Sequence, residues 1–240
     1  MESSTTSNRR AGKTEQEHTI RPREHLAAID QALTERFGDP SSPNRRPALD
    51  ELVLTILSQN TTSTNTRRAY DAMRAQYPDW ADVLAAPQAD LEALLRPGGL
   101  APTKAVRIQR ILAELAKRGP LSLDFLDGWE TEAIEQWLLE LDGVGYKTAR
   151  CVLLFALGRD AFPVDTHILR ILKRVGLLSE TRTLEQAHRD VAANVPQGRS
   201  YSLHVNLIRL GRTLCRPQKP KCAECPLLDL CAYGQNNPGT

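Results

Sequence analysis

The segment Leu141-Asp142-Gly143-Val144-Gly145 decides the fold, because it is a short glycine-containing hairpin between two helical stretches. The stretches 131–140 and 147–157 on either side carry apolar residues at the three- and four-residue spacing of amphipathic helices. Two glycines around one apolar residue allow a tight turn, and the following helix begins with free N–H groups. Such a helix start attracts phosphate, although a glycine pair between helices is commonly only a connection.

On both sides of this hairpin, apolar residues continue to recur at the three- and four-residue spacing of helices. Strand patterns are scarce. Prolines stand where helices would start, and breaks occur near Pro78, Pro87 and the 119–128 stretch. The predicted helices with the clearest apolar stripes are 22–37, 49–57, 102–115, 131–140, 147–157, 166–175, 184–191 and 200–214. We therefore predict an all-α protein without an internal repeat.

Length and composition limit the class of protein. The chain has 240 residues, 41% of them hydrophobic and 25% charged, which is typical of a soluble protein with one or two domains. No apolar run approaches the about 18 residues of a membrane helix, so we expect no membrane association. Residues 1–22, up to the proline that starts the first helix, are polar and predict a disordered tail. The net charge of +2 does not by itself indicate nucleic-acid binding.

Lys147 lies in the first turn of the helix after the hairpin, where the helix dipole disfavours a cation by about 0.3 to 1 kcal/mol. That field, together with partial burial, would favour the uncharged amine, which is the form that attacks carbon. The alternative is a solvated lysine that contacts DNA phosphate. Lys147 is therefore a candidate nucleophile.

Asp165 follows an apolar run, at the start of the predicted helix 166–175. Capping that helix is its ordinary role. A carboxylate held there can also stabilise positive charge that develops on a sugar, and the two roles are compatible. The residues alone favour the cap and leave the charge-stabilising role of Asp165 open, and no role is assigned to the nearby His167.

Four of the five cysteines, Cys215, Cys222, Cys225 and Cys231, fall within 17 positions, with six, two and five residues between them. A disulfide framework would spread them more widely, so this clustering indicates a cofactor in a reducing cytosol. Four thiolates can hold zinc or a four-iron cluster, and their spacing alone does not decide between the two. Cys151 lies among apolar residues and is predicted to be a small core residue.

Three cations, Arg216, Lys219 and Lys221, lie between the first two cysteines with no acidic residue among them. Such a loop can contact the DNA backbone, and a solvated basic loop is the alternative. We include Lys219 among the expected DNA contacts.

From about Arg23 to Cys231 the chain resembles the endonuclease III family of helix-hairpin-helix DNA glycosylases. Three motifs occur in the family order: the hairpin with its lysine at 141–149, the aspartate segment at 164–167, and the four-cysteine spacing. The resemblance implies that Lys147 and Asp165 are the catalytic pair and that the cofactor is a 4Fe-4S cluster rather than zinc.

The resemblance also implies two helical lobes with the active site in the cleft between them. Residues 41–159 would form a six-helix barrel lobe that contains the hairpin. Residues 23–40 and 160–240 would form the iron-sulfur cluster lobe from both chain ends. Lys147 and Asp165 would then face each other across the cleft.

Two loops resemble the family segments that enter the DNA duplex. Where the family pattern has alanine then glutamine after a serine, this chain has Gln59 and Asn60, which places Asn60 at the position that fills the gap of an extruded base. Leu100 matches a second, apolar wedge. The hairpin residues Gly143, Val144 and Gly145 complete the expected DNA contacts. Asp142 replaces the proline of the family pattern, and its charge predicts weaker phosphate binding.

These features predict a bifunctional DNA glycosylase and AP lyase that removes oxidised pyrimidines from duplex DNA through a lysine Schiff base. We expect a cytoplasmic, nucleoid-associated monomer. One alternative is a monofunctional mismatch or uracil glycosylase of the same fold, against which Lys147 argues because such an enzyme uses water. The other is a non-catalytic DNA-binding protein.

Overall fold

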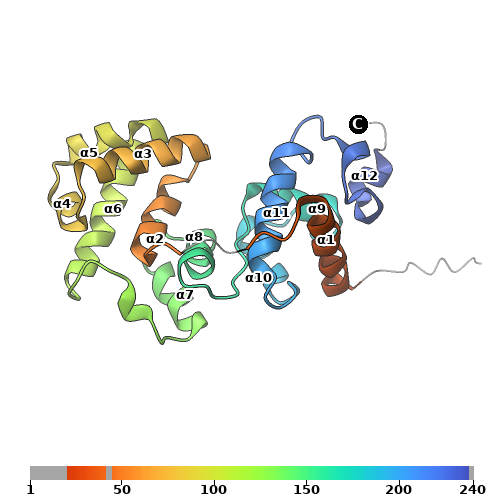
Figure 1. Cartoon of the computed structure of the whole chain (residues 1–240), viewed down its shortest axis with the longest axis horizontal. Coiled ribbons are helices and arrows are strands. Elements are labelled where there is room, and N and C mark those ends of the chain that lie inside the picture. Colours follow the sequence, from red (N-terminus) through yellow and green to blue (C-terminus); the bar gives the residue numbers. More distant parts are fainter. Residues whose placement is uncertain (1–20, 42–44, 238–240) are drawn as a thin grey trace, which may run out of the picture.

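The computed structural model describes residues 21–41 and 45–237. Within these ranges all regular secondary structure is helical (Figure 1). Positions 1–20 of the predicted tail lie outside the described residues. Pro22, which that prediction included, is instead the first residue of a helix, because its fixed φ suits the first helical turn. None of the described helices is long and apolar enough to cross a membrane.

The predicted helices are all present, with ends shifted by at most a few residues, and the all-α prediction is confirmed. The α-helices are α1 (Pro22–Phe37), α2 (Ala48–Leu57), α3 (Ser63–Gln76), α4 (Trp80–Ala85), α5 (Gln88–Leu95), α6 (Ala101–Ala116), α7 (Thr131–Leu139), α8 (Tyr146–Cys151), α9 (Thr166–Arg174), α10 (Leu184–Ala192), α11 (Ser200–Thr213) and α12 (Ala232–Asn236). The 3-10 segments are η1 (Arg96–Gly98), η2 (Asp124–Leu126), η4 (Cys222–Glu224) and η5 (Leu228–Leu230). The predicted helix 147–157 divides into α8 and the π-helical η3 (Val152–Ala156).

Buried apolar side chains form two separate clusters, one in each lobe of Figure 1. The first runs from Ala48 to Ala161 and joins α2 through η3. The second runs from Leu26 to Cys231 and joins α1 with α9, α10, α11 and the cysteine-rich end. Two helical lobes are therefore present. The domain boundaries at 40/41 and 159/160 stay a prediction, because a shared core does not test independent folding.

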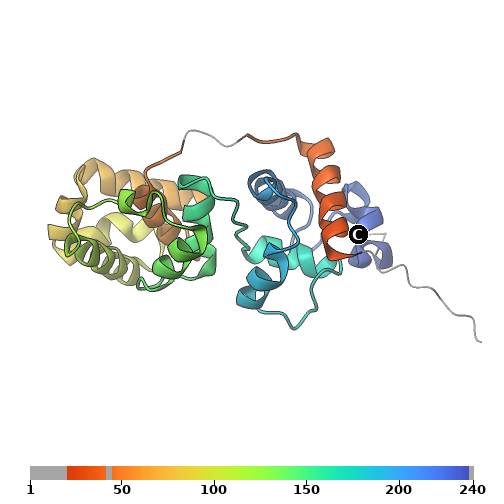
Figure 2. The same ribbon diagram turned by 90° about the horizontal axis from the view of Figure 1, so that it is seen from below.

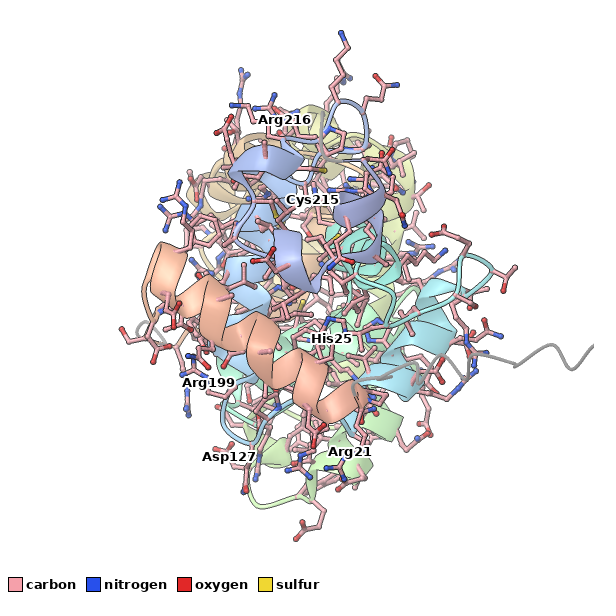
Figure 3. All side chains as sticks on the ribbon, turned by 90° about the vertical axis from the view of Figure 1, so that its right-hand side faces the viewer. Arg21, His25, Asp127, Arg199, Cys215 and Arg216 are labelled. Atoms are coloured by element: carbon pink, nitrogen blue, oxygen red, sulfur yellow. The ribbon has the colours of Figure 1, made fainter. Side chains whose placement is uncertain are left out.

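The second lobe combines both ends of the chain. α1 and α2 lie in different lobes, as do η3 and α9, so the chain passes twice between them (Figure 2). His25 Nε2 on α1 lies 2.9 Å from Leu230 O, next to the last cysteine. Arg199 Nε pairs with Asp30 Oδ2 at 2.6 Å, which joins α1 to the start of α11. Figure 3 looks onto α1, with His25 and Arg199 beside it and Cys215 above.

A buried arginine connects α8 to the second lobe. Arg150 Nε donates to Glu135 Oε1 on α7 at 2.6 Å, and its Nη1 donates to His188 O on α10 at 2.8 Å. Arg150 is 9% exposed, so these contacts balance a charge that is largely removed from water. The helix that carries Lys147 is thereby fixed against a wall of the other lobe.

Candidate active site and cysteine loop

A cavity of about 810 Å³ lies between the two lobes, with walls contributed by α8 on one side and by α9, α10 and α11 on the other. Both Lys147 and Asp165 line it. The full lining consists of Ser58, Gln59, Asn60, Thr61, Leu139, Gly145, Tyr146, Lys147, Thr148, Asp165, Thr166, His167, Leu184, Glu185, His188 and Arg212. The structure therefore brings the amine and the carboxylate into one space that is large enough for a nucleobase.

The amine of Lys147 is held by the end of α2. Its Nζ donates to Ser58 Oγ at 3.3 Å, and Ser58 Oγ donates its own proton to Thr55 O at 2.7 Å. Because that proton is already used, the serine oxygen presents a lone pair to the amine. Cys151, one turn further along, is 4% exposed, and burial raises the pKa of its thiol to about 11. It is therefore a neutral core residue beside the amine.

Asp165 is the N-cap of α9. Its Oδ1 accepts a hydrogen bond from Ile168 N at 2.8 Å, which accounts for the ordinary capping role. The segment that leads to it is fixed by His204, whose Nδ1 lies 2.9 Å from Pro163 O. Burial lowers the pKa of His204 to about 4, so its ring is neutral at physiological pH. The carboxylate is thus placed at the cavity wall by a helix cap and a buried histidine.

Aromatic rings line the α8 and α10 sides of the cavity. The rings of Tyr146 and His188 lie with their centroids 6.0 Å apart at an interplanar angle of 30°. His188 is 1% exposed, and burial lowers its pKa to about 4. The ring is therefore neutral, and it lines the cavity together with Lys147 and Arg212.

The hairpin before α8 requires glycine at its first turn position. Gly143 has a φ of +73°, and a Cβ there would lie 2.2 Å from Arg107 Nε. Val144 is 6% exposed and packs into the first lobe, so its side chain is not available for contact with a ligand. Gly145 is exposed and is the N-cap of α8.

The two residues after Ser58 differ in their surroundings. The Gln59 side chain is bound within the protein: Oε1 accepts from Arg107 Nη1 at 3.1 Å, and Nε2 donates to Gly143 O at 3.3 Å. Asn60 is exposed and has a left-handed backbone, with a φ of 54°. Of this pair, Asn60 is therefore the exposed residue.

Leu100 projects from the surface immediately before α6. It is 55% exposed and has a left-handed φ of 51°, so it is not a packed core residue. Asp142, beside the hairpin, pairs with Arg110 Nη1 at 3.0 Å, and both side chains are exposed. The unfavourable charge of Asp142 is thus partly balanced by a cation that the sequence interpretation did not assign.

Sequence reasoning missed three side chains that organise this surface: Ser58, Arg107 and Lys104. Lys104 stands four residues before Ile108, in register with the apolar face of α6, and this spacing was a signal that its side chain is buried. Nothing in the spacing indicates what it contacts. The partners of Ser58 and Arg107 come from distant parts of the chain and leave no local pattern.

All four clustered cysteines line a single pocket, together with Arg174, Lys221 and mostly apolar neighbours. N–H groups approach two of the sulfurs: Arg174 Nη1 lies 3.2 Å from Cys215 Sγ, and Gly234 N lies 3.3 Å from Cys231 Sγ. Such donors stabilise the negative charge of cluster thiolates. Burial raises the pKa of the Cys225 thiol to about 11, so a bound metal is needed to hold it as thiolate at neutral pH.

The donor set of this pocket suits a metal cofactor that binds sulfur. Four thiols line it, and these could be the ligands of zinc or of a polynuclear iron-sulfur cluster.

The loop between the first two cysteines is held by Arg174, which donates to Arg216 O at 2.7 Å and to Pro217 O at 2.9 Å. Figure 3 shows Cys215 and Arg216 at this end of the lobe. Lys219 is exposed and has a left-handed φ of 49°. Lys221 pairs with Glu224 at 3.0 Å, so its charge is partly balanced by an acid that lies just beyond the loop.

Comparison with known proteins gives two family matches. Residues 53–197 match the HhH-GPD superfamily of base excision DNA repair proteins, and residues 215–231 match the iron-sulfur binding domain of endonuclease III. The second match begins at Cys215 and ends at Cys231.

Individual relatives agree with these matches. A provisionally named DNA glycosylase of Arabidopsis thaliana is 38% identical over 75% of this chain, which spans only 65% of that protein's length. Endonuclease III of Bacillus subtilis is 34% identical, with 77% of this chain and 81% of the relative covered. Endonuclease III of Thermotoga maritima is 32% identical, with 87% and 92% covered.

Solved structures of similar fold include two complexes of endonuclease III with DNA. A non-covalent complex gives a TM-score of 0.78 at 26% identity and covers 91% of this chain and 99% of the other. A trapped covalent intermediate gives a TM-score of 0.76 at 26% identity, with 89% and 97% covered.

Proposed function

Because the chain belongs to the endonuclease III family of base excision DNA repair proteins, we propose that it removes oxidised pyrimidines from duplex DNA and then cleaves the strand at the abasic site. Membership makes it a DNA glycosylase, and the cysteine loop is a 4Fe-4S cluster site. The observation that carries the finer proposal is that Lys147 and Asp165 line one cavity between the lobes.

In the proposed reaction, the damaged pyrimidine leaves the base stack and enters this cavity. The C1′–N bond lengthens, and the carboxylate of Asp165 stabilises the positive charge that develops on the sugar. The neutral amine of Lys147 attacks C1′, and the bonding electrons leave with the base, which takes up a proton. Loss of the ring oxygen from C1′ then gives a Schiff base between Lys147 and the opened deoxyribose.

The Schiff base acidifies the hydrogen on C2′. Removal of that proton expels the 3′ phosphate with its electron pair, which is β-elimination, and water then hydrolyses the imine to free Lys147. The four cysteines would hold the cluster and thereby the loop that carries Lys219. The linings of the catalytic cavity and of the cysteine pocket share no residue.

DNA would lie across the mouth of the interlobe cavity. In this arrangement the exposed Asn60 and Leu100 would insert into the duplex, and the backbone of Gly143, Val144 and Gly145 and the side chain of Lys219 would contact phosphates. We propose that the protein acts as a monomer, since these elements all come from one chain.

Borohydride trapping tests the proposal, because hydride reduces the Schiff base to a stable amine. Intact cluster-loaded protein is mixed with borohydride and a duplex that holds one abasic site, and the covalent complex is measured by denaturing electrophoresis. A panel of duplexes with one oxidised pyrimidine, uracil or mismatched adenine then defines the substrate. Trapping with release of oxidised pyrimidines supports the proposal.

Other outcomes select the alternatives. Base release without trapping or strand cleavage would indicate a monofunctional glycosylase that activates water. Binding without base release or cleavage would indicate a non-catalytic DNA-binding protein. Either result would overturn the lyase assignment.

The Asp142→Asn variant is expected to bind abasic duplex about 3-fold more tightly at low salt, because it removes a negative charge beside the hairpin and frees Arg110 for phosphate. The Asp142→Pro variant should bind at least as tightly, since it also removes the charge. Dissociation constants measured across a salt series check this. Asp127→Asn, an exposed carboxylate after η2, is the matched control. Affinity that is unchanged in both Asp142 variants would show that the charge is irrelevant.

The Cys222→Ala variant is expected to lose the cluster and about 4 kcal/mol of stability, because Cys222 is one of four cysteines around the pocket that the cluster would occupy. Iron analysis, the visible absorption of the cluster and limited proteolysis of residues 215–237 check the result. Cys151→Ala removes a buried cysteine outside this cavity and should retain iron. Full iron content in Cys222→Ala would contradict the assignment of that ligand.

A further inference from the structure

Lys104 is a buried lysine whose three N–H donors are all used by backbone carbonyls. It is 1% exposed, and its Nζ donates to Leu57 O at 2.7 Å, to Gln59 O at 2.8 Å and to Gly98 O at 2.9 Å. Three donors are the full capacity of an ammonium group. Burial lowers the pKa of Lys104, which shows that the site opposes the charge it contains.

These three carbonyls belong to two loops that are far apart in the sequence. Leu57 and Gln59 lie at the end of α2, and Gly98 ends η1. Each loop then continues into an exposed residue with a left-handed backbone: Asn60 with a φ of 54° and Leu100 with a φ of 51°.

A left-handed conformation is tolerated by asparagine but is unfavourable for leucine, so at Leu100 it persists where surrounding contacts hold it. Each loop has contacts of its own, such as the bond from Arg107 to the Gln59 side chain and the bond from Lys104 N to Leu100 O. The ammonium group of Lys104 binds both loops at once, within a few residues of the two left-handed positions. An apolar residue at position 104 would fill the space without fixing the loops relative to each other. Burial of the Lys104 cation is costly, and what it provides is a fixed position of the two loops relative to each other.

We propose that Lys104 is the positioning residue for the duplex-inserting side chains, and that it sets the separation and direction of Asn60 and Leu100. This inference rests on the proposed function, in which these two residues enter the base stack. Lys104 touches neither DNA nor the reacting atoms. It acts by clamping the two loops to the first turn of α6, and therefore affects only substrates whose stack must be opened.

A comparison of paired and unpaired substrates follows from that distinction. A lesion in a duplex must be extruded and its gap filled, whereas a lesion in a single strand has no partner base to separate. Loss of the clamp should slow reaction on the duplex and leave the single strand unaffected. A general loss of folding or of amine reactivity would slow both.

The experiment uses cluster-loaded Lys104→Met, which keeps the length of the side chain and removes its donors. Single-turnover cleavage is measured on one abasic strand, alone and annealed to its complement. We expect the duplex rate to fall by roughly 10- to 100-fold, the effect of small displacements in a positioned group, with an unchanged single-strand rate. A fluorescent purine analogue opposite the lesion should show a smaller rise on binding, because the stack is opened less often.

Two further variants keep the test decisive. Lys104→Gln retains an amide donor and is expected to lie between wild type and Lys104→Met; it carries the test if the methionine variant does not fold. Lys117→Met removes an exposed lysine just after the same helix and is the matched control. Equal losses on both substrates, or no loss on either, would overturn the positioning role.

Failure of the proposed function gives a different result. If wild-type protein forms no borohydride-trapped complex on the single strand, the Schiff-base chemistry is wrong whatever the Lys104 variants do. If wild type is trapped and Lys104→Met reacts with both substrates as wild type does, only the inference about Lys104 fails.

Discussion

Replacing Lys147 by glutamine is expected to abolish borohydride trapping on abasic DNA and to lower base release by at least about 10³-fold. The amide nitrogen of glutamine does not attack C1′ and cannot form a Schiff base. Glutamine still fits the half-buried position and can donate to Ser58 Oγ, so the wall of the cavity should be kept. The measurements are the yield of trapped complex and single-turnover rates of base release and strand cleavage.

Loss of chemistry must be separated from loss of folding or of binding. The melting temperature, iron content and dissociation constant for abasic duplex of Lys147→Gln should stay close to those of wild type. Lys117→Gln removes an exposed lysine after α6 and should be trapped normally. Trapping of Lys147→Gln at the wild-type yield would show that a different amine forms the imine and would remove Lys147 from its proposed role.

The helices and the order of motifs could be predicted from local sequence because each depends on neighbours along the chain. The stripe from Ala105 to Leu115 predicts α6, and the glycines at 143 and 145 predict the hairpin. The division of helix 147–157 into α8 and the π-helical η3 was not predicted, since both conformations place similar residues on the buried face.

The candidate site was likewise predictable only in its local features. Placement of Lys147 in a first turn and of Asp165 at a cap follows from local spacing. The contact between Lys147 and Ser58 joins positions 89 residues apart, and no periodicity encodes it. Lys104 shows the limit most clearly: its register predicts burial, while its three carbonyl partners depend on how α2 and η1 pack against α6.

Asp165 gives the second large effect, because its two roles can be separated by substitution. The variant Asp165→Asn keeps a side-chain oxygen that can accept from Ile168 N, and it loses only the charge. We expect its base-release rate to fall by roughly 10²- to 10³-fold, the usual effect of removing one group that stabilises transition-state charge. Its melting temperature should stay close to that of wild type, because the cap of α9 is kept.

Asp165→Ala removes both functions and should therefore lose activity to a similar extent and also about 1 kcal/mol of stability from the uncapped α9. Asp165→Ser restores a capping oxygen without a carboxylate, so it should recover the stability and not the rate. Rates and melting temperatures of the three variants thus distinguish a charge effect from a cap effect. If activity instead followed stability across the series, with Asp165→Asn and Asp165→Ser both near wild type, the carboxylate would serve only to start α9, and the positive sugar would have to be stabilised by another group in the cavity.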